Sequence, residues 1–483
     1  MPSIAFHTLG CKLNFAESSH LLRLFKQKGF QENEFHKVSD VYVINTCTVT
    51  SVAEKKCRAA IRQAKKLNPD AVIAVIGCFS QVNAKEIEKI DGVSIILGND
   101  DKNQLVDRVL DYLENINSVV ENINSNSETK NSTKTEITQS NTTNNSDKQT
   151  ISSDNQEINL NKQGNNLRKT DKNTINAVVD INSVKTFAPS ISFEDRTRGF
   201  LKVQDGCDYF CTYCEIPFAR GRSRSCSVEQ AVHYAKLLEQ ENKKEIVLTG
   251  VNIGDFGKGT NENFLDLIKA LDSQTSVARY RISSIEPDLL TKDIIDFCAN
   301  SRAFLPHFHI PLQSGSNVVL KSMNRHYNRE EFAEKVLYIQ SVMPNCFIAC
   351  DCLAGFNSET EEEFQSCLDF LASLPIAFIH VFTYSDRPDT KAYRIEGKVP
   401  VNERRKRSER LQELSDRKKR EFYLRNVGYK AKVLWEEADK EGKMYGFSDN
   451  YLRCVKDYDS NLVNQITDES LDILSPDNDL FIL

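Results

Sequence analysis

The chain has 483 residues and a formal net charge of −6, with 40% hydrophobic and 27% charged residues. These values are ordinary for a globular protein of about two to four domains. Its 14 cysteines are too sparse for a disulfide-stapled scaffold. The longest apolar run, residues 71–79, is far shorter than the roughly 20 residues that cross a bilayer. Because the N-terminus also lacks the features of a secretory signal, we expect a cytoplasmic protein with reduced thiols and no membrane contact.

Strand and helix patterns alternate in the first part of the chain, which we expect to form one domain over residues 1–114. The strand patterns lie at residues 3–9, 40–46, 71–77 and 93–97. The clearest helical patterns lie at residues 16–28 and 52–67. This alternation predicts a parallel sheet covered by helices.

Residues 115–187 differ from the rest in composition. Of these 73 residues, 17 are Asn, 9 are Ser and 10 are Thr, and the only aromatic residue is Phe187. Such a segment buries too little apolar surface to offset the entropy lost on ordering. We therefore expect a disordered linker or insert.

The alternation of strands and helices resumes after the linker, in a predicted domain over residues 188–423. Strand patterns lie at 199–203, 245–250, 280–284, 307–311, 347–353 and 378–382. Helical patterns lie at 228–240, 264–271, 289–299, 329–342 and 359–371. Six strands with intervening helices predict a partial (β/α)6 barrel. An open doubly wound sheet is the alternative that the sequence leaves open.

The charge changes sign near the C-terminus. Residues 401–432 carry a net charge of +7, and residues 433–483 carry −8. Short stretches of alternating polarity in the acidic segment predict a small all-β domain over residues 424–483.

Three cysteines lie close together in the segment QDGCDYFCTYC: Cys207, Cys211 and Cys214. They follow the first predicted barrel strand, and the loops after barrel strands form the active face of such folds. Three thiolates on one loop can hold three irons of a 4Fe–4S cluster and leave the fourth iron open to a ligand. The alternatives are unrelated thiols or a zinc site, but structural zinc takes four ligands.

Three more cysteines each follow a predicted strand of the N-terminal domain: Cys11, Cys47 and Cys78. The carboxyl ends of parallel strands meet at one edge of a sheet, where ligands bind. We therefore expect these thiols to converge on a second metal cluster, helped by the preceding Gly10 and Gly77, which permit close backbone approach. The remaining eight cysteines are expected to be buried apolar residues.

These motifs resemble a known family. The loop CDYFCTYC resembles that of radical S-adenosylmethionine enzymes, and LGCKLN, NTCTVT and IGC together resemble the methylthiotransferase subfamily. The C-terminal 60 residues or so resemble the small RNA-binding β domain called TRAM. HTLGCKLN and KVQDGCDYFCTYC are most similar to enzymes that modify threonylcarbamoyladenosine in tRNA. Sister branches act on isopentenyladenosine in tRNA or on an aspartate of a ribosomal protein.

The resemblance implies two 4Fe–4S clusters and S-adenosylmethionine as cofactors. Reductive cleavage of that cofactor would give a deoxyadenosyl radical, which takes the hydrogen from C2 of the adenine, and a methylated sulfide on the second cluster would join this carbon. No acid–base side chain is implied, since the cofactors carry the chemistry. An electron donor of flavodoxin or ferredoxin type and a sulfur donor are implied as partners, and no DNA.

The resemblance also suggests residues around the cofactor at the ends of predicted barrel strands. These candidates are Thr249, Gly250, Asn252, Ser284, Glu286, His309 and Gln313. For contact with tRNA the candidates are Arg220, Arg222, Arg224, Arg404 and Arg405, because arginine pairs with phosphates and stacks on bases. Two alternatives stay open: the same chemistry on a protein side chain, and a non-catalytic iron–sulfur protein that binds RNA.

Overall fold

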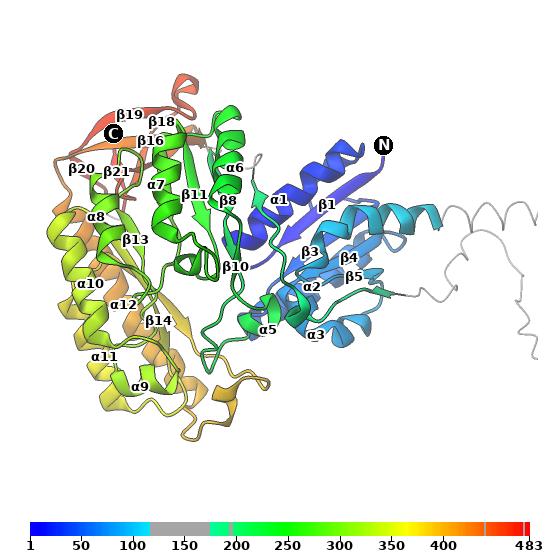
Figure 1. Cartoon of the computed structure of the whole chain (residues 1–483), viewed down its shortest axis with the longest axis horizontal. Coiled ribbons are helices and arrows are strands. Elements are labelled where there is room, and N and C mark those ends of the chain that lie inside the picture. The colour runs from blue at the N-terminus through cyan, green and yellow to red at the C-terminus, as the bar shows by residue number, and fades with distance from the viewer. Residues whose placement is uncertain (116–173, 193–196, 439–440, 477–478) are drawn as a thin grey trace, which may run out of the picture.

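The computed structural model describes residues 1–115, 174–192, 197–438, 441–476 and 479–483. Three parts follow one another along the chain (Figure 1): an N-terminal α/β domain, a central barrel, and a small C-terminal β domain that packs on the barrel. Among the described helices, none is both long and apolar enough to cross a membrane.

The N-terminal domain is a six-stranded parallel sheet in the order β2-β1-β3-β4-β5-β6. Its strands are β1 (Ser3–Thr8), β2 (Gln31–Asn33), β3 (Val41–Thr46), β4 (Val72–Gly77), β5 (Ile95–Ile96) and β6 (Ile175–Asn176). Its helices are α1 (Lys12–Gln27), α2 (Ser51–Leu67), α3 (Cys78–Glu88) and a helix over 105–115. The strands β3 and β4 are buried along their whole length because helices cover both faces of the sheet.

The expected linker needs a correction at its end. Residues 116–173 lie outside the described residues, but residues 174–187 do not behave as a linker. There β6 adds to the sheet beside β5, with Ile175 N donating to Ser94 O over 2.9 Å. This pairing satisfies backbone groups of the short apolar stretch INAVV. The average composition of the whole segment concealed that stretch.

The central domain is an open barrel of six parallel strands, as expected. These are β8 (Arg198–Lys202), β11 (Glu245–Thr249), β12 (Arg279–Ile282), β13 (His307–His309), β14 (Phe347–Ala354) and β15 (Phe378–Thr383). The helices between them are α6 (Val228–Gln240), α7 (Phe264–Gln274), α8 (Lys292–Asn300), α9 (Asn317–Ser322), α10 (Arg329–Val342) and α11 (Glu361–Ser373). Parallel bridges between Ser284 and His309 and between Tyr280 and Phe304 join the two halves of the barrel wall.

The barrel does not close. On one side, β8 pairs with the short antiparallel β7 (Ser190–Ile191). On the other, α12 (Val401–Arg425) packs along β15 (Phe378–Thr383), where the Ser415 hydroxyl donates to Ile379 O over 2.8 Å. Among the described strands, none bridges β15 to β8. The strands of the wall therefore stay unpaired between β15 and β8, and Phe15 and Ala16 of α1 pack on Phe200 and Val247 near the β8 edge.

The C-terminal domain is all-β, as expected, with the sheet order β19-β16-β17-β18-β21-β20. Its strands are β16 (Tyr429–Ala438), β17 (Lys443–Ser448), β18 (Arg453–Asp457), β19 (Ile466–Leu471), β20 (Ile473–Leu474) and β21 (Phe481–Ile482). It packs at the amino ends of the barrel strands. There Arg279 donates to Lys432 O over 2.6 Å, and Arg281 donates to Ser448 O over 2.9 Å.

Candidate functional site

The three N-terminal cysteines converge at the carboxyl edge of their sheet. Cys47 directly follows β3, Cys78 directly follows β4, and Cys11 lies three residues after the end of β1. Burial raises the pKa of Cys47 to about 12, and the neighbouring Cys78 and Cys11 add to this rise. A thiol in this setting gives up its proton when a metal is present to take the thiolate.

Two glycines make this convergence possible. Gly10 has φ +101°, and a Cβ at this position would lie 2.9 Å from the Cβ of Cys47. Gly77 has φ +105°, and its Cβ would lie 2.6 Å from the Thr46 carbonyl oxygen. Both backbone conformations strain residues other than glycine, so these positions permit the close approach of the cysteine-bearing loops.

The second set of cysteines lies on the loop between β9 (Gln204–Asp205) and α5 (Ile216–Arg220). Each sulfur accepts a hydrogen bond: Cys207 from Tyr209 N over 3.5 Å, Cys214 from Ile216 N over 3.4 Å, and Cys211 from Arg325 over 3.0 Å. Burial raises the pKa of Cys207 to about 12. Three sulfurs with N–H donors around them fit an iron–sulfur cluster, whose thiolate ligands accept such bonds.

The segments that carry the two sets of cysteines contact each other. Thr48, next to Cys47, donates a 2.6 Å hydrogen bond to Glu215, next to Cys214. Asn99 spans the same boundary, since its side-chain nitrogen lies 3.5 Å from the Cys78 sulfur and donates to Ala219 O over 2.7 Å. The residues that join the two domains are thus the immediate neighbours of both cysteine sets.

A buried charge network fixes this arrangement. Glu17 of α1 pairs with Lys102, with Lys202 over 2.9 Å and with Arg220 over 3.0 Å, and Arg220 also pairs with Asp205 over 3.0 Å. Burial opposes the ionisation of Glu17, but Arg220, Lys102 and Lys202 hold its pKa well below the ordinary value. Each of these groups is buried. Separating α1 from the barrel would leave uncompensated buried charges, which is strongly destabilising, so the network holds α1 in place.

Buried polar atoms without partners lie in the segment after β11. The Thr249 hydroxyl and both polar atoms of the Asn252 side chain are buried with no hydrogen-bond partner among the described residues. Gly250 lies against Gln204, so that a Cβ there would come within 2.9 Å of its side-chain oxygen. Gln313, also expected beside the cofactor, has φ +69° and donates its backbone N–H to Asp351 O over 2.8 Å. Buried polar atoms without partners are rare, so Thr249 and Asn252 are candidates for contact with a polar ligand.

Arg325 connects one further expected residue, Glu286, to the cysteine loop. It donates to the Cys211 sulfur and forms an ion pair with Glu286. Burial raises the pKa of Glu286 to about 7, although Arg325 opposes the rise. Sequence reasoning missed Arg325, because it lies in a helix-connecting loop and no strand end precedes it.

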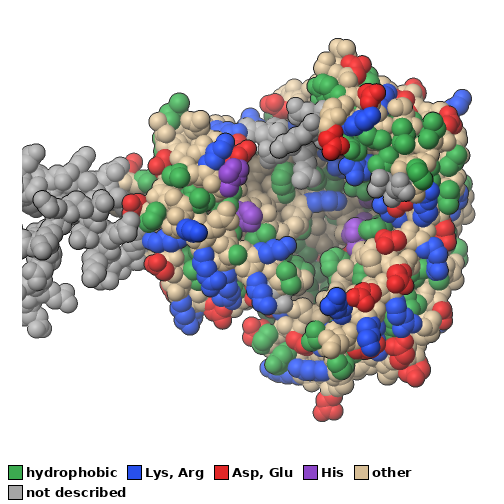
Figure 2. Space-filling model, turned by 180° about the vertical axis from the view of Figure 1, so that it is seen from behind, with side chains coloured by type: hydrophobic (Ala, Val, Ile, Leu, Met, Phe, Trp, Pro, Cys, Tyr) green, Lys and Arg blue, Asp and Glu red, His purple; other side chains and the backbone are tan. Residues whose placement is uncertain are grey.

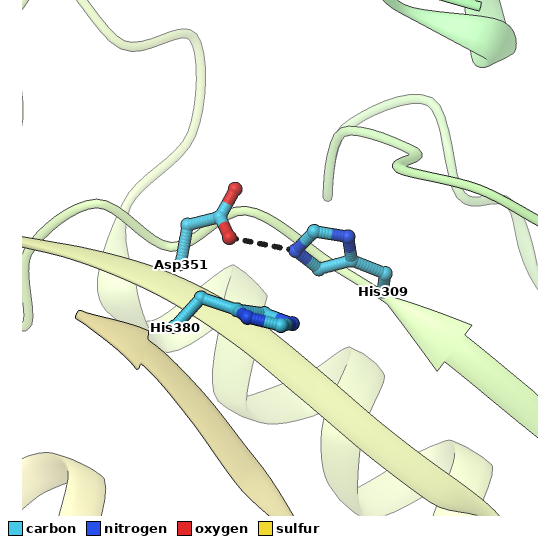
Figure 3. A group of neighbouring side chains, drawn as sticks. All are labelled: His309, Asp351 and His380. Atoms are coloured by element: carbon cyan, nitrogen blue, oxygen red, sulfur yellow. Dashed lines mark hydrogen bonds and ion pairs between the residues drawn. The ribbon is translucent and has the colours of Figure 1, made fainter. Parts of the chain in front are cut away.

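A chain of polar side chains crosses the inner barrel wall (Figure 3). Ser284 and His309 Nδ1 are 2.9 Å apart, and His309 Nε2 lies 2.7 Å from an Asp351 oxygen. The exposed His380 lies beside them. One nitrogen or oxygen atom from each of His309, Asp351 and His380 lies within 4.8 Å of the other two. Burial lowers the pKa of His380 to about 4, and nearby His309 adds to this. Asp351 was missed, although it is the only charged residue of its strand.

Lys12 lies beside the first cysteine set. It follows Cys11 at the start of α1 and is solvent-accessible. Burial lowers the pKa of Lys12, and nearby Arg198 and Arg281 add to this, whereas Tyr451 and Glu245 oppose it. Figure 2 shows a hollow on one face of the molecule, with basic and histidine side chains along it.

The five arginines expected to contact RNA divide into two groups, and three need a correction. Arg220 is buried in the network above, and Arg404 is buried with Asp386 at 2.9 Å. Arg224 donates to the carbonyls of Thr186 and Arg220. These side chains satisfy internal acceptors and have no free face for a phosphate.

The other two arginines are exposed, as contact with RNA requires. Arg222 lies over the Phe210 ring with its side chain 65% exposed. The side chain of Arg405 is 80% exposed. A sequence does not distinguish such residues from their buried neighbours in the same arginine-rich stretch.

Comparison with known proteins gives the class first. Residues 201–371 match the model of the radical SAM superfamily. The fold is similar to that of the radical S-adenosylmethionine methyltransferase TsrM from Kitasatospora setae, with a TM-score of 0.52, 13% identity, and coverage of 81% of this chain and 77% of that one. Fold and match together define a radical SAM enzyme.

The family follows from the curated relatives. Residues 3–98 match the family described as uncharacterized protein family UPF0004. The chain is 34% identical to the threonylcarbamoyladenosine tRNA methylthiotransferase MtaB of Bacillus subtilis (strain 168), over 96% of this chain and 93% of the relative. The Aquifex aeolicus (strain VF5) protein of that name is 35% identical, over 90% and 93%. The chain therefore belongs to the radical SAM tRNA methylthiotransferase family, whose cofactors are 4Fe–4S clusters and S-adenosylmethionine.

Proposed function

We propose that this enzyme replaces the hydrogen on C2 of N6-threonylcarbamoyladenosine, next to the anticodon of tRNA, with a methylthio group. In this proposal Cys207, Cys211 and Cys214 hold one 4Fe–4S cluster. Cys11, Cys47 and Cys78 hold the second. The observation that carries the proposal is the hydrogen bond between Thr48 and Glu215, because it sets the residue beside one cysteine set against the residue beside the other.

The residues around Cys207, Cys211 and Cys214 are suited to S-adenosylmethionine. The Thr249 hydroxyl and the Asn252 amide offer unpartnered donors and acceptors to the amino and carboxylate groups of the methionine part. Arg325 and Glu286 lie beside Cys211 and supply one charge of each sign. When bound, the cluster and this cofactor supply a carbon radical that abstracts hydrogen, and the second cluster supplies the sulfur.

The protein itself positions the reactants. An aromatic C2–H is not acidic, so a general base contributes little to breaking it. The network of Glu17, Arg220 and Asp205 instead holds the two domains in one register. A fixed register keeps the reacting atoms at a short distance and excludes water, which accounts for much of the rate that an enzyme adds.

Exposed cationic side chains support a role in binding tRNA. Arg222 stacks on Phe210 at 4.4 Å, an arrangement suited to an unpaired base. Arg405 is suited to a phosphate. We further propose that a flavodoxin- or ferredoxin-like donor supplies electrons, that a separate donor supplies sulfur, and that the enzyme works in the cytoplasm, where tRNA is modified.

Mass spectrometry of nucleosides tests the substrate. Bulk tRNA from cells without this gene is digested and compared with wild type and with cells that express the chain again. Loss of the methylthio form of threonylcarbamoyladenosine, restored on re-expression, supports the proposal.

Other results of that experiment contradict the proposal. A relative from Desulforamulus reducens, 29% identical over 90% of this chain and 84% of its own, is named tRNA-2-methylthio-N(6)-dimethylallyladenosine synthase. Loss of the isopentenyl form alone would indicate that this enzyme modifies isopentenyladenosine. Unchanged nucleosides with a missing mass on a ribosomal protein would indicate a protein substrate. Purified, iron-loaded protein that releases no deoxyadenosine would indicate a non-catalytic RNA-binding protein.

A further inference from the structure

Three side chains of the barrel wall form a group of ligand-type atoms outside the two cysteine sets. His309, Asp351 and His380 each place one nitrogen or oxygen atom within 4.8 Å of the other two (Figure 3). They come from the adjacent strands β13, β14 and β15, and Asp351 and His380 are direct partners in the register of the last two. Because paired strands keep a fixed spacing, the group belongs to a rigid part of the fold.

The group lies on the inner face of the wall. Cys350 and Cys352, on either side of Asp351, are buried in the core between strands and helices, and so is Ile379, next to His380. Successive side chains of a strand point to opposite faces, so Asp351 and His380 point away from these helices. His380 is exposed, and the group is therefore open to solvent on this face.

Hydrogen bonds within the protein account for only part of the group. His309 Nε2 lies 2.7 Å from one Asp351 oxygen, and His309 Nδ1 lies 2.9 Å from the Ser284 hydroxyl. Among the described residues, none bonds to the second Asp351 oxygen or to either ring nitrogen of His380. His380 instead makes ring contacts, with His309 at 5.0 Å and with Phe378 at 4.8 Å between centroids. The group thus retains ligand atoms that the protein itself leaves unused.

Two imidazoles and one carboxylate are a ligand set for divalent transition metals. Each nitrogen or oxygen then lies about 2.0–2.2 Å from the metal, so two ligand atoms on opposite sides are about 4.2 Å apart. Rotation of the exposed His380 covers the difference from 4.8 Å, and the ion replaces the hydrogen between His309 and Asp351. An anion is disfavoured, because Asp351 is negative and Lys12, which acts on His380, only balances that charge.

Ser284 supplies the support that a histidine ligand needs. Ligating histidines almost always donate their second ring N–H to an oxygen, which fixes the orientation of the ring. The contact between His309 Nδ1 and the Ser284 hydroxyl meets this requirement and leaves Nε2 as the ligand atom. A parallel bridge between the backbones of the same two residues holds them in register.

We propose that His309, Asp351 and His380 bind a divalent transition metal ion, distinct from the iron of the two clusters, with Ser284 as a positioning residue. This inference gives His309 a role other than the cofactor contact that the sequence suggested. It does not depend on which adenosine the enzyme modifies. Three protein ligands leave at least one position open to a further ligand, as in catalytic rather than structural metal sites.

Contacts connect this metal site to the loop of Cys207, Cys211 and Cys214. Ser284 and Glu286 lie in one segment after β12. Glu286 pairs with Arg325, which also donates to the Cys211 sulfur. The open position of the metal would therefore serve an oxygen-bearing ligand, a carboxylate or a hydroxyl, on the side of the barrel that carries the cysteine loop.

Zinc binding tests the site independently of activity. Iron-loaded protein is dialysed anaerobically against buffered Zn²⁺, and mass spectrometry of the elements counts bound zinc and iron. X-ray absorption at the zinc edge identifies the ligand atoms. We compare wild type with His380→Gln, Asp351→Asn and Ser284→Ala. The matched control is His233→Gln, which removes an exposed histidine of α6 outside the group.

The expected result is specific to the group. Wild type and His233→Gln bind about one zinc per chain at unchanged iron content, with nitrogen at about 2.0–2.1 Å and no sulfur at about 2.3 Å. His380→Gln and Asp351→Asn lose this zinc at the same free concentration. Ser284→Ala raises the Kd for zinc about ten- to hundredfold, as loss of a supporting partner does. Because His380 is exposed, His380→Gln decides the outcome if Asp351→Asn does not fold.

Two results overturn the inference. The first is that wild type binds no more zinc than His380→Gln. The second is zinc that has sulfur ligands or is bound in exchange for iron, because it then occupies the cysteines. Neither result bears on the proposed function, which the analysis of nucleosides tests separately.

Discussion

Thr48 donates a 2.6 Å hydrogen bond to Glu215, a residue 167 positions further along the chain. The two residues are the direct neighbours of Cys47 and Cys214. Arg387 reinforces the contact, since it donates to the Thr48 carbonyl and pairs with Glu54. The boundary between the two domains is therefore built from the cysteine-bearing loops themselves, and a movement of one domain would displace both cysteine sets relative to each other.

The two cysteine sets should separate in function. We expect Cys47→Ala to abolish methylthiolation but to spare release of deoxyadenosine, because the cysteines at 207, 211 and 214 stay intact. Iron content should fall by about half, as for loss of one of two similar clusters. Iron analysis and chromatography of deoxyadenosine measure the two effects.

The matched control for this prediction is Cys57→Ala, which removes a buried thiol near Cys47 that lies outside the set. It should retain its iron and both activities. Equal loss of deoxyadenosine release and methylthiolation in Cys47→Ala would contradict the division of roles.

The hydrogen bond between Thr48 and Glu215 should affect the amount of methylthio product formed per cofactor cleaved more than it affects cofactor cleavage itself. Thr48→Val removes the hydroxyl that donates a hydrogen bond to Glu215 and keeps the shape of the side chain. We expect the yield of methylthio product per deoxyadenosine to fall about tenfold or more, because a small displacement of reacting groups is costly. Thr260→Val, which removes an exposed hydroxyl bonded to Gly257 O, should leave the ratio unchanged. A wild-type ratio in Thr48→Val would show that the bond does not position the reactants.

The unpartnered amide of Asn252 should contribute to binding of the methionine part of the cofactor. Asn252→Ala is expected to raise the Kd for S-adenosylmethionine about tenfold, the value of one hydrogen bond to a charged group. Equilibrium dialysis on iron-loaded protein measures this Kd. Asn300→Ala, on an exposed helix end, is the control. Equal affinities of the two variants would show that Asn252 does not contact the cofactor.

The buried network should make stability depend on pH. Because the pKa of Glu17 is well below its ordinary value of 4.5, its ionised form favours the folded state. This contribution is present above that value and is lost as the pH falls toward the lowered pKa. Glu17→Gln should cost about 3–5 kcal/mol at pH 7, as for breaking other buried ion pairs.

Thermal unfolding of wild type and Glu17→Gln at pH 7 and pH 4 measures the effect. The difference in Tm should shrink at the lower pH. Glu334→Gln, on the exposed face of α10, should behave as wild type at both values. A difference that grows on acidification would contradict the assignment of charge to Glu17.

Much of the fold could be predicted from local patterns. The six barrel strands and the helices α6 and α10 occur where the apolar periodicity indicates them, because both element types repeat at fixed intervals. The edge strand β2 is only three residues long and polar, too short for a periodic signal. The strand β6 lay within a segment whose average composition concealed it.

The sequence by itself determined the class of chemistry. The spacing of three cysteines on one loop and the position of three others after parallel strands are local properties, and parallel strands bring their ends to one edge whatever packs around them. Tertiary structure alone decided which charged residues are used internally and which face a ligand. Arg220 and Arg222 are two positions apart, yet one completes a buried network and the other is exposed. Whether a charged side chain is paired depends on distant segments of the chain that no local pattern specifies.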